Sequence, residues 1–126
     1  MKPMQTEAQL VAIVDDDEDV RNAVHAVLKS AGLSPRSFAS AEDFLGSGKR
    51  SETACLISDI EMPGMNGLEL QARLAEDGGR IPIIFITAYG NARTRTRAMK
   101  AGALDFLEKP FDDEILIERV RTALGT

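Results

Sequence analysis

The sequence feature that most limits the fold is a regular alternation of short apolar segments with segments of helical periodicity. Compact apolar runs typical of buried strands occupy five ranges: 9–14, 34–38, 54–59, 81–87 and 104–109. Helical spacing, helix caps and glycine stops mark the five ranges that follow them: 20–31, 40–48, 67–76, 91–101 and 112–124. Strands that alternate with helices form parallel sheets. The sequence therefore predicts an α/β fold in which a five-stranded parallel sheet carries helices on both faces.

Local signals refine this prediction. Pro35 lacks a backbone N–H, so the segment 34–38 is expected near an edge of the sheet. Ser40 and Asn66 stand where two helices need an N-cap, and Asp17 with its acidic neighbours suits the N-terminus of the first helix.

Size and composition indicate one ordinary globular domain. The chain has 126 residues, of which 44% are hydrophobic and 28% charged, and its net charge of −5 does not suit nucleic-acid binding. Cys55 is the single cysteine and fits a reducing cytoplasm, and no secretory signal is visible. No apolar run approaches the ~20 residues that span a membrane. We therefore expect a cytoplasmic protein without membrane contact, with a flexible tail over residues 1–8 and a single domain over residues 9–126.

Polar side chains follow four of the five predicted strands. In a parallel α/β sheet, ligands bind beyond the carboxyl ends of the strands. At that edge the first strand leads into Asp15 and Asp16, the third ends in Asp59, the fourth in Thr87 and the fifth in Lys109. One aspartate after a strand is usually a turn residue or a helix cap. Three aspartates that converge with a hydroxyl and an ammonium group indicate a binding site instead.

The predicted cluster carries more negative than positive charge. Two carboxylates about 4 Å apart repel by about 4 kcal/mol at an effective dielectric constant of about 20, a large share of a stability of roughly 5–15 kcal/mol. Lys109 neutralises one charge, and the all-oxygen ligand set favours Mg²⁺ as the partner of the others. Mg²⁺, a lysine and a carboxylate suit phosphoryl transfer, with Asp59 as nucleophile and Asp15 and Asp16 holding the metal.

Four motifs, in their order and spacing, resemble one known family and cover nearly the whole chain. They are VDD at residues 14–16, SDIEMPGMNG at 58–67, ITA at 86–88 and KAGALDFLEKPF at 100–111. Together they are similar to receiver domains of bacterial two-component response regulators, the CheY-like superfamily, and DFLEKPF is most similar to the FixJ-type subgroup. The resemblance implies a flavodoxin-like fold with strand order 2-1-3-4-5. It also implies that residues 9–126 form a receiver domain, with no output domain in this chain.

The resemblance implies roles for individual residues. Asp59 matches the phosphoacceptor, and Asp15 and Asp16 match the acidic pair that binds Mg²⁺, with Asp16 the more direct ligand. The backbone carbonyl of Glu61 matches a further ligand, and Asp59 itself completes the implied metal set. Lys109 matches the lysine that contacts the phosphoryl oxygens.

Further residues match the part of the family that responds to phosphorylation. Thr87 matches the hydroxyl that moves toward the phosphoryl group, and Phe106 matches the aromatic residue that turns inward with it. The Lys109–Pro110 peptide bond is often cis in this family, as X-Pro chemistry permits. Glu61 and Tyr89 each lie two residues beyond a site residue, and we predict that they tune the lifetime of the phosphoryl group.

The implied function is a phosphorylation switch and not a metabolic enzyme. A sensor histidine kinase or phosphotransfer protein donates the phosphoryl group to Asp59 in a Mg²⁺-dependent reaction, and the domain changes conformation to control an output domain or protein. The domain catalyses only its own phosphorylation and dephosphorylation. No direct contact of this chain with nucleic acid is expected.

The segment 91–101 departs from the family pattern. It carries Thr94, Arg95 and Thr96 where family members often have apolar residues. A homodimer on phosphorylation remains one open outcome, but an apolar patch on this helix is a doubtful route to it. The basic segment is either a solvated charged face or a weakly docked helix that phosphorylation can remodel.

A haloacid-dehalogenase-like phosphatase is the alternative function. Such enzymes also use an aspartyl-phosphate and Mg²⁺, with Asp15 here as the nucleophile. The other residues that this alternative would recruit are Asp17, Thr87, Lys109, Asp112 and Asp113. Against it, Asp112 and Asp113 begin a helix rather than end a strand, the chain has no room for a cap domain, and Asp59 would have no role.

Overall fold

The computed structural model describes residues 9–126, and the tail predicted over residues 1–8 lies outside this range. Strands and helices alternate along the described chain, as the sequence predicts. The elements are β1 (Leu10–Val14), α1 (Glu18–Ser30), β2 (Ser34–Phe38), α2 (Ala41–Gly46), the 3₁₀ helix η1 (Arg50–Glu52), β3 (Thr53–Asp59), α3 (Gly67–Glu76), β4 (Ile83–Thr87), α4 (Ala92–Lys100), β5 (Asp105–Glu108) and α5 (Asp113–Leu124).

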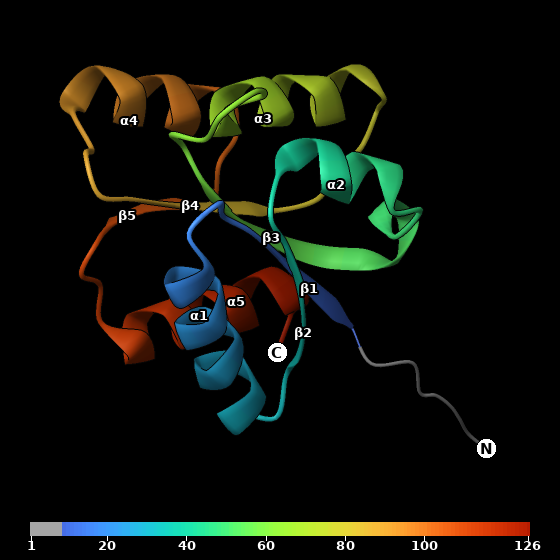
Figure 1. Ribbon diagram of the computed structural model, residues 1–126, viewed down its shortest axis with the longest axis vertical. Coiled ribbons are helices and arrows are strands. Elements are labelled where there is room, and N and C mark those ends of the chain that lie inside the picture. Colours follow the sequence, from blue (N-terminus) through green and yellow to red (C-terminus); the bar gives the residue numbers. More distant parts are fainter. Residues whose placement is uncertain (1–8) are drawn as a thin grey trace.

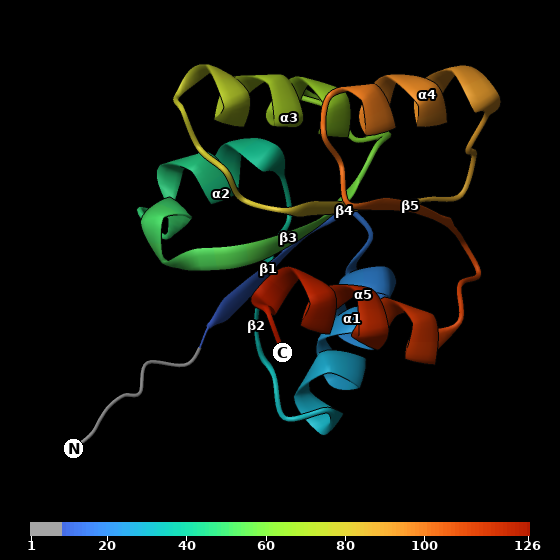
Figure 2. The same cartoon turned by 180° about the vertical axis from the view of Figure 1, so that it is seen from behind.

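The strands form one parallel sheet in the order β2-β1-β3-β4-β5. Figure 1 shows α2, α3 and α4 on one face of this sheet and α1 and α5 on the other, and the view from behind in Figure 2 agrees. This is the flavodoxin-like arrangement, and the predicted fold class is confirmed. The strand that contains Pro35 lies at the edge, as expected from its missing N–H donor.

Two hydrophobic cores hold the helices against the two faces. Along β4, Ile83 and Phe85 belong to the core under α2, α3 and α4, whereas Ile84 and Ile86 belong to the core under α1 and α5. Alternate side chains of a strand point to opposite faces, so a strand covered on both sides is apolar throughout. This is why the buried strands appear in the sequence as unbroken apolar runs.

Side-chain caps fix the starts of the helices that lead away from the site. The carboxylate of Asp17 accepts hydrogen bonds from the N–H groups of Asp19 and Val20 at the start of α1. Ser40 caps α2, and Asn66 forms a reciprocal capping box with Glu69 at the start of α3. The caps predicted at Ser40 and Asn66 are confirmed, and Asp17, expected at the N-terminus of the first helix, is its N-cap.

The predicted strand 81–87 is too long by two residues. β4 begins at Ile83, because Pro82 has no N–H to donate and only its carbonyl oxygen joins the sheet, accepting the N–H of Leu56 at 2.9 Å. The other predicted elements differ from the observed ones by two residues or fewer at each end.

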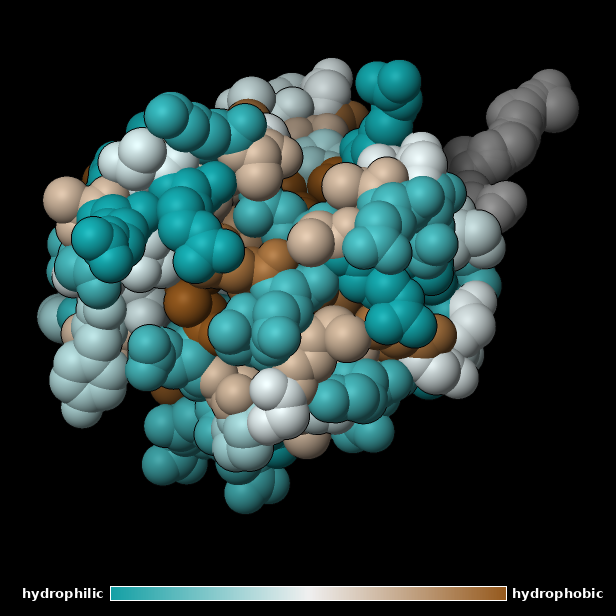
Figure 3. All heavy atoms as spheres, turned by 90° about the horizontal axis from the view of Figure 1, so that it is seen from above, coloured by the Kyte–Doolittle hydropathy of each residue, from teal (hydrophilic) through white to brown (hydrophobic). Residues whose placement is uncertain are grey.

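Helix α4 is the most weakly buried α-helix. Ala98 is its one buried residue, whereas every other α-helix buries at least two. The buried side chain of Gln71 in α3 donates a hydrogen bond to the carbonyl of Ala98 at 3.1 Å. Figure 3 shows the face that carries α3 and α4. Hydrophilic side chains dominate this face, and apolar side chains are visible among them. The expectation of a weakly docked helix agrees with this small buried surface.

Within residues 9–126, every helix is too short or too polar to cross a lipid bilayer.

Candidate functional site

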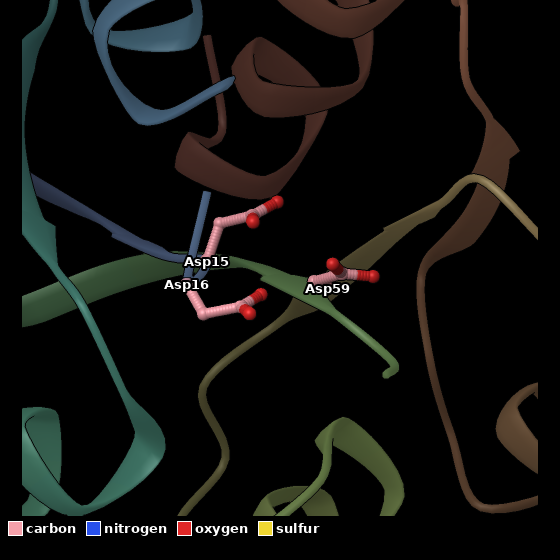
Figure 4. A group of neighbouring side chains, drawn as sticks. All are labelled: Asp15, Asp16 and Asp59. Carbon is pink, nitrogen blue, oxygen red and sulfur yellow. The ribbon is translucent and has the colours of Figure 1, made fainter. Parts of the chain in front are cut away.

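Three carboxylates meet at the carboxyl edge of the sheet. β1 leads directly into Asp15 and Asp16, and the neighbouring strand β3 ends in Asp59. One carboxylate oxygen from each of the three lies within 4.8 Å of the other two. Figure 4 shows the side chains of Asp15 and Asp16 leaving the end of β1 toward the side on which Asp59 lies. The convergence predicted from the strand ends is therefore present.

Asp15 is the buried member of the acidic pair. Its side chain has no exposed surface, and it accepts the N–H of Asp17 on Oδ1 at 2.9 Å and the ammonium group of Lys109 on Oδ2 at 3.0 Å. Asp16, the next residue, is exposed. The backbone carbonyl of Asp15 accepts a hydrogen bond from Arg21 at 2.8 Å, which holds the turn against α1. One carboxylate of the pair is thus fixed by the protein and the other faces solvent.

Lys109 links the acidic pair to Asp59. Its Nζ donates to Asp15 at 3.0 Å and to Asp59 at 3.4 Å. The N–H of Lys109 donates to the carbonyl of Thr87 at 2.8 Å, and the following bond to Pro110 is cis, as predicted. Burial alone would lower the pKa of Lys109, but the hydrogen bonds and charges of the two aspartates outweigh it and raise this pKa above its ordinary value.

Asp59 is buried and electrostatically strained. Its Oδ1 accepts the N–H groups of Ile60 at 2.7 Å and Glu61 at 3.4 Å, while Oδ2 faces Lys109. Burial and then the charge of Asp15 raise the pKa of Asp59, although Lys109 and the N–H of Ile60 act in the opposite direction. The protein therefore holds this carboxylate in a setting that favours neutralisation of its charge.

Gly67 makes room for the end of β3. A Cβ at this position would lie 2.3 Å from the backbone carbonyl oxygen of Asp59 and 3.0 Å from the Cα of Ile60. The N–H of Gly67 donates to the carbonyl of Ile60 at 2.8 Å. Helix α3 can therefore begin directly against the strand that presents Asp59, because its first residue has no side chain.

Thr87 lies at the end of β4, one residue beyond Ile86, which is the register partner of Asp59. The side chain of Thr87 is buried, and its hydroxyl oxygen accepts the N–H of Tyr89 at 3.3 Å. Tyr89 itself is 79% exposed. The hydroxyl thus stands at the correct edge of the sheet, while the Tyr89 ring faces solvent.

Phe106 is buried in the core beneath α4. The guanidinium of Arg95 lies 5.8 Å from the centre of its ring and donates a hydrogen bond to its backbone carbonyl at 3.3 Å. A Cβ on Gly90 would meet this ring at 2.9 Å. In this structure the aromatic residue is therefore turned inward, with Arg95 above it.

The donor set fits a hard divalent cation. Three carboxylates face one ammonium group, so the cluster has an excess of negative charge, and its ligand atoms are all oxygens. Asp16 is exposed and accessible to an ion, and Glu61 lies in the loop that leaves Asp59, with its N–H directed at the same carboxylate. The cluster can thus hold a metal ion.

Two contacts near the site were not predicted from the sequence. Glu42 reaches the loop after β3, and Arg95 covers Phe106 instead of standing free in solvent. No local pattern announces the first contact. For the second, the presence of an arginine where an apolar residue is usual was the only signal.

Comparison with known proteins gives a consistent result. The model of the response regulator receiver domain matches residues 11–121. Response regulator protein TodT of Pseudomonas putida is 44% identical over 124 residues, which cover 98% of this chain and 55% of TodT. Transcriptional regulatory protein FixJ of Azorhizobium caulinodans is 42% identical over 115 residues, 91% of this chain and 54% of FixJ. The crystal structure of FixJ-N superposes with a TM-score of 0.84 at 38% identity, covering 95% of this chain and 96% of that one.

The chain spans about half the length of the curated relatives that it matches.

Proposed function

Because the chain belongs to the family of response regulator receiver domains, we propose that Asp59 is the phosphoacceptor of a Mg²⁺-dependent phosphorylation switch. The observation that carries this assignment is the setting of Asp59: a buried carboxylate at the end of β3, held by backbone N–H groups on one oxygen and facing Lys109 with the other. The donor is a sensor histidine kinase or a phosphotransfer protein, and the target of the switch is an output domain or protein.

In the transfer step, a carboxylate oxygen of Asp59 attacks the phosphorus of a phosphohistidine. The phosphorus–nitrogen bond breaks, an acyl phosphate forms, and the leaving imidazole takes up a proton from solvent. Lys109 is placed to contact the incoming phosphoryl oxygens, because its ammonium group already reaches Asp59. The proposed metal ligands are Asp15, Asp16, Asp59 and the backbone carbonyl of Glu61, and the bound Mg²⁺ supplies positive charge to the phosphoryl oxygens.

The proposed response passes through Thr87 and Phe106. A phosphoryl group on Asp59 adds negative charge beside the end of β4, where the Thr87 hydroxyl can donate to it after leaving the N–H of Tyr89. The buried ring of Phe106 lies on the next strand and under α4, the α-helix with the fewest buried residues. The domain acts as a signalling switch, and its only reactions are its own phosphorylation and dephosphorylation.

We propose that Tyr89 and Glu61 set the phosphoryl lifetime, because they are exposed residues on the two sides of the site. Tyr89→Ala and Glu61→Ala are expected to change the dephosphorylation rate. Rates equal to that of the wild type in both variants would end this assignment. A reducing cytoplasm, expected from the single cysteine, is the proposed compartment.

The phosphatase alternative gains no support. Asp17, which it needs as a second catalytic aspartate, caps α1, and Asp112 caps α5 with hydrogen bonds from Glu114 and Ile115. The family match favours the receiver assignment instead.

The test is intact-mass measurement after incubation with a small phosphodonor, with and without Mg²⁺, followed by peptide mapping. We expect a Mg²⁺-dependent phosphoryl adduct on Asp59 that is absent from Asp59→Asn. An adduct on Asp15, or continued turnover of the donor by Asp59→Asn, would favour the phosphatase. A folded protein that accepts no phosphoryl group from any donor would refute the proposed function.

A further inference from the structure

The loop between β3 and α3, residues 60–66, connects the phosphoacceptor strand to the next helix and includes Glu61. Its far end is fixed by the capping box of Asn66 and Glu69. Between its ends, and among the described residues 9–126, the loop backbone donates one hydrogen bond to a side chain of a non-adjoining element. The N–H of Met65 donates to Oε2 of Glu42, in α2, at 2.9 Å.

The Glu42 carboxylate also covers the preceding loop residue. Gly64 has φ of +76°, and a Cβ built on it would lie 2.6 Å from Oε2 of Glu42. Two consecutive loop residues therefore fit against one carboxylate. A larger residue at position 64 would be strained by its backbone conformation and would also collide with Glu42.

Helix α2 gives Glu42 a fixed base. Its neighbours Ala41 and Phe44 have no exposed surface, and Ser40 caps the helix through the N–H of Asp43. The hydrogen bond from Met65 is the main cause that lowers the pKa of Glu42, so the carboxylate remains ionised at neutral pH and the bond is charge-assisted.

We propose that Glu42 is a positioning residue for the metal site: it holds the loop after β3 so that the backbone of Glu61 stays beside Asp59. The inference rests on the proposed function, because it assigns Glu61 as a carbonyl ligand. Groups that orient metal ligands commonly contribute about 10–100-fold to metal affinity. Glu42 acts through several backbone bonds, so we expect its removal to weaken metal binding by about 3- to 10-fold.

The experiment measures binding of Mn²⁺, an oxygen-seeking substitute for Mg²⁺, by electron paramagnetic resonance on the full chain without any phosphodonor. Glu42→Ala removes the acceptor, and Glu42→Gln keeps an amide oxygen that can accept the N–H of Met65. Asp43→Ala is the matched control, since it removes an exposed carboxylate from the same helical turn. Thermal unfolding in EDTA establishes that each variant is folded.

We expect a 3- to 10-fold higher dissociation constant for Glu42→Ala, near wild-type binding for Glu42→Gln, and no change for Asp43→Ala. Wild-type affinity in Glu42→Ala overturns the proposal. An equal loss of affinity in Glu42→Ala, Glu42→Gln and Asp43→Ala also overturns it. Each of these variants removes one negative charge, so an equal loss would come from that distant charge and not from the hydrogen bond to Met65.

A double-mutant cycle gives a second test. Gly64→Ala should also weaken Mn²⁺ binding, both by straining the loop and by displacing the Glu42 carboxylate, so its effect should be clearly smaller when Glu42 is already alanine. Additive losses overturn the proposal. Failure of the proposed function itself is distinguishable, because the wild type would then bind no Mn²⁺ at the cluster, and Asp16→Asn would leave its binding unchanged.

Discussion

Replacing Asp59 with asparagine should stabilise the metal-free protein. The variant keeps an oxygen for the N–H of Ile60 and loses the negative charge, together with the oxygen that faces Lys109. At an effective dielectric constant of about 20, each carboxylate at 4.8 Å or less repels Asp59 by about 3.5 kcal/mol or more, and Lys109 at 3.4 Å attracts it by about 5 kcal/mol. Exposure of Asp16 weakens one repulsion, whereas burial of Asp59 adds a cost. We expect a net gain of about 1–2 kcal/mol in the variant.

The pH dependence follows from the raised pKa of Asp59. Below the unfolded-state pKa of about 3.9, Asp59 is protonated in both states and its charge costs nothing. As pH rises from there through the higher folded-state pKa, the wild type loses stability because its folded state must release a proton reluctantly. The advantage of Asp59→Asn should therefore be small near pH 4 and should grow as the pH rises through the folded-state pKa.

Thermal unfolding in EDTA and in Mg²⁺ measures this effect. A gain of 1–2 kcal/mol should raise the midpoint by about 3–8 °C in EDTA at pH 7 for a chain of this size. Mg²⁺ at ten times its dissociation constant should then stabilise the wild type by about 1.4 kcal/mol and the variant by less. The difference between the unfolding midpoints of the two proteins should therefore be smaller in Mg²⁺ than in EDTA. Asp43→Asn, an exposed control, should show neither effect. A lower midpoint for Asp59→Asn in EDTA, or equal Mg²⁺ stabilisation of both proteins, would refute the electrostatic reasoning.

Two further substitutions test the packing around the site. Gly67→Ala should destabilise the protein by about 3 kcal/mol in urea denaturation and slow phosphorylation, because the new Cβ would lie 2.3 Å from the backbone oxygen of Asp59. The control is Gly46→Ala, whose Cβ would meet nothing within 4 Å. It should leave the free energy of unfolding unchanged or increase it. Arg95→Ala should cost about 1 kcal/mol and change the ring environment of Phe106 in NMR spectra, while exposed Arg93→Ala should do neither. If a variant and its control lost the same stability, the close packing of Gly67 or the contact between Arg95 and Phe106, respectively, would not be the cause.

The strands and the acidic cluster could be predicted from the sequence. Both depend on local apolar patterns and on the rule that parallel strands end at the same edge of a sheet. Unbroken apolar runs locate the strands, and parallel strands end at a common edge. Asp15, Asp59 and Lys109 therefore fall together once the strands are known, although 94 residues separate the first from the last. Burial of Asp15 and exposure of Asp16 are less predictable, because they depend on the path of the turn after β1.

Contacts between elements on the same face were beyond sequence reasoning. Glu42 and Met65 are 23 residues apart, and their hydrogen bond depends on how far α2 leans toward the loop. Arg95 and Phe106 meet because α4 crosses above β5, and a basic helix alone suggested a solvated face. Periodicity specifies which side of a helix is buried, but not the rotation and tilt that decide which exposed side chains touch a neighbour.

The distribution of burial explains how a charge change at Asp59 can reach the surface. Asp59 is the last residue of β3, and Lys109 directly follows β5 and donates its backbone N–H to the carbonyl of Thr87, so the sheet limits how far either residue can move when charge is added. Phe106 lies on β5 beneath α4, and α4 is attached by Ala98, by the bond from Gln71 and by Arg95 on the ring. The α-helix with the fewest buried residues therefore lies above the buried aromatic residue. A change in the position of that ring would act on a helix with a single buried residue, so we expect α4 to move more readily than the other α-helices.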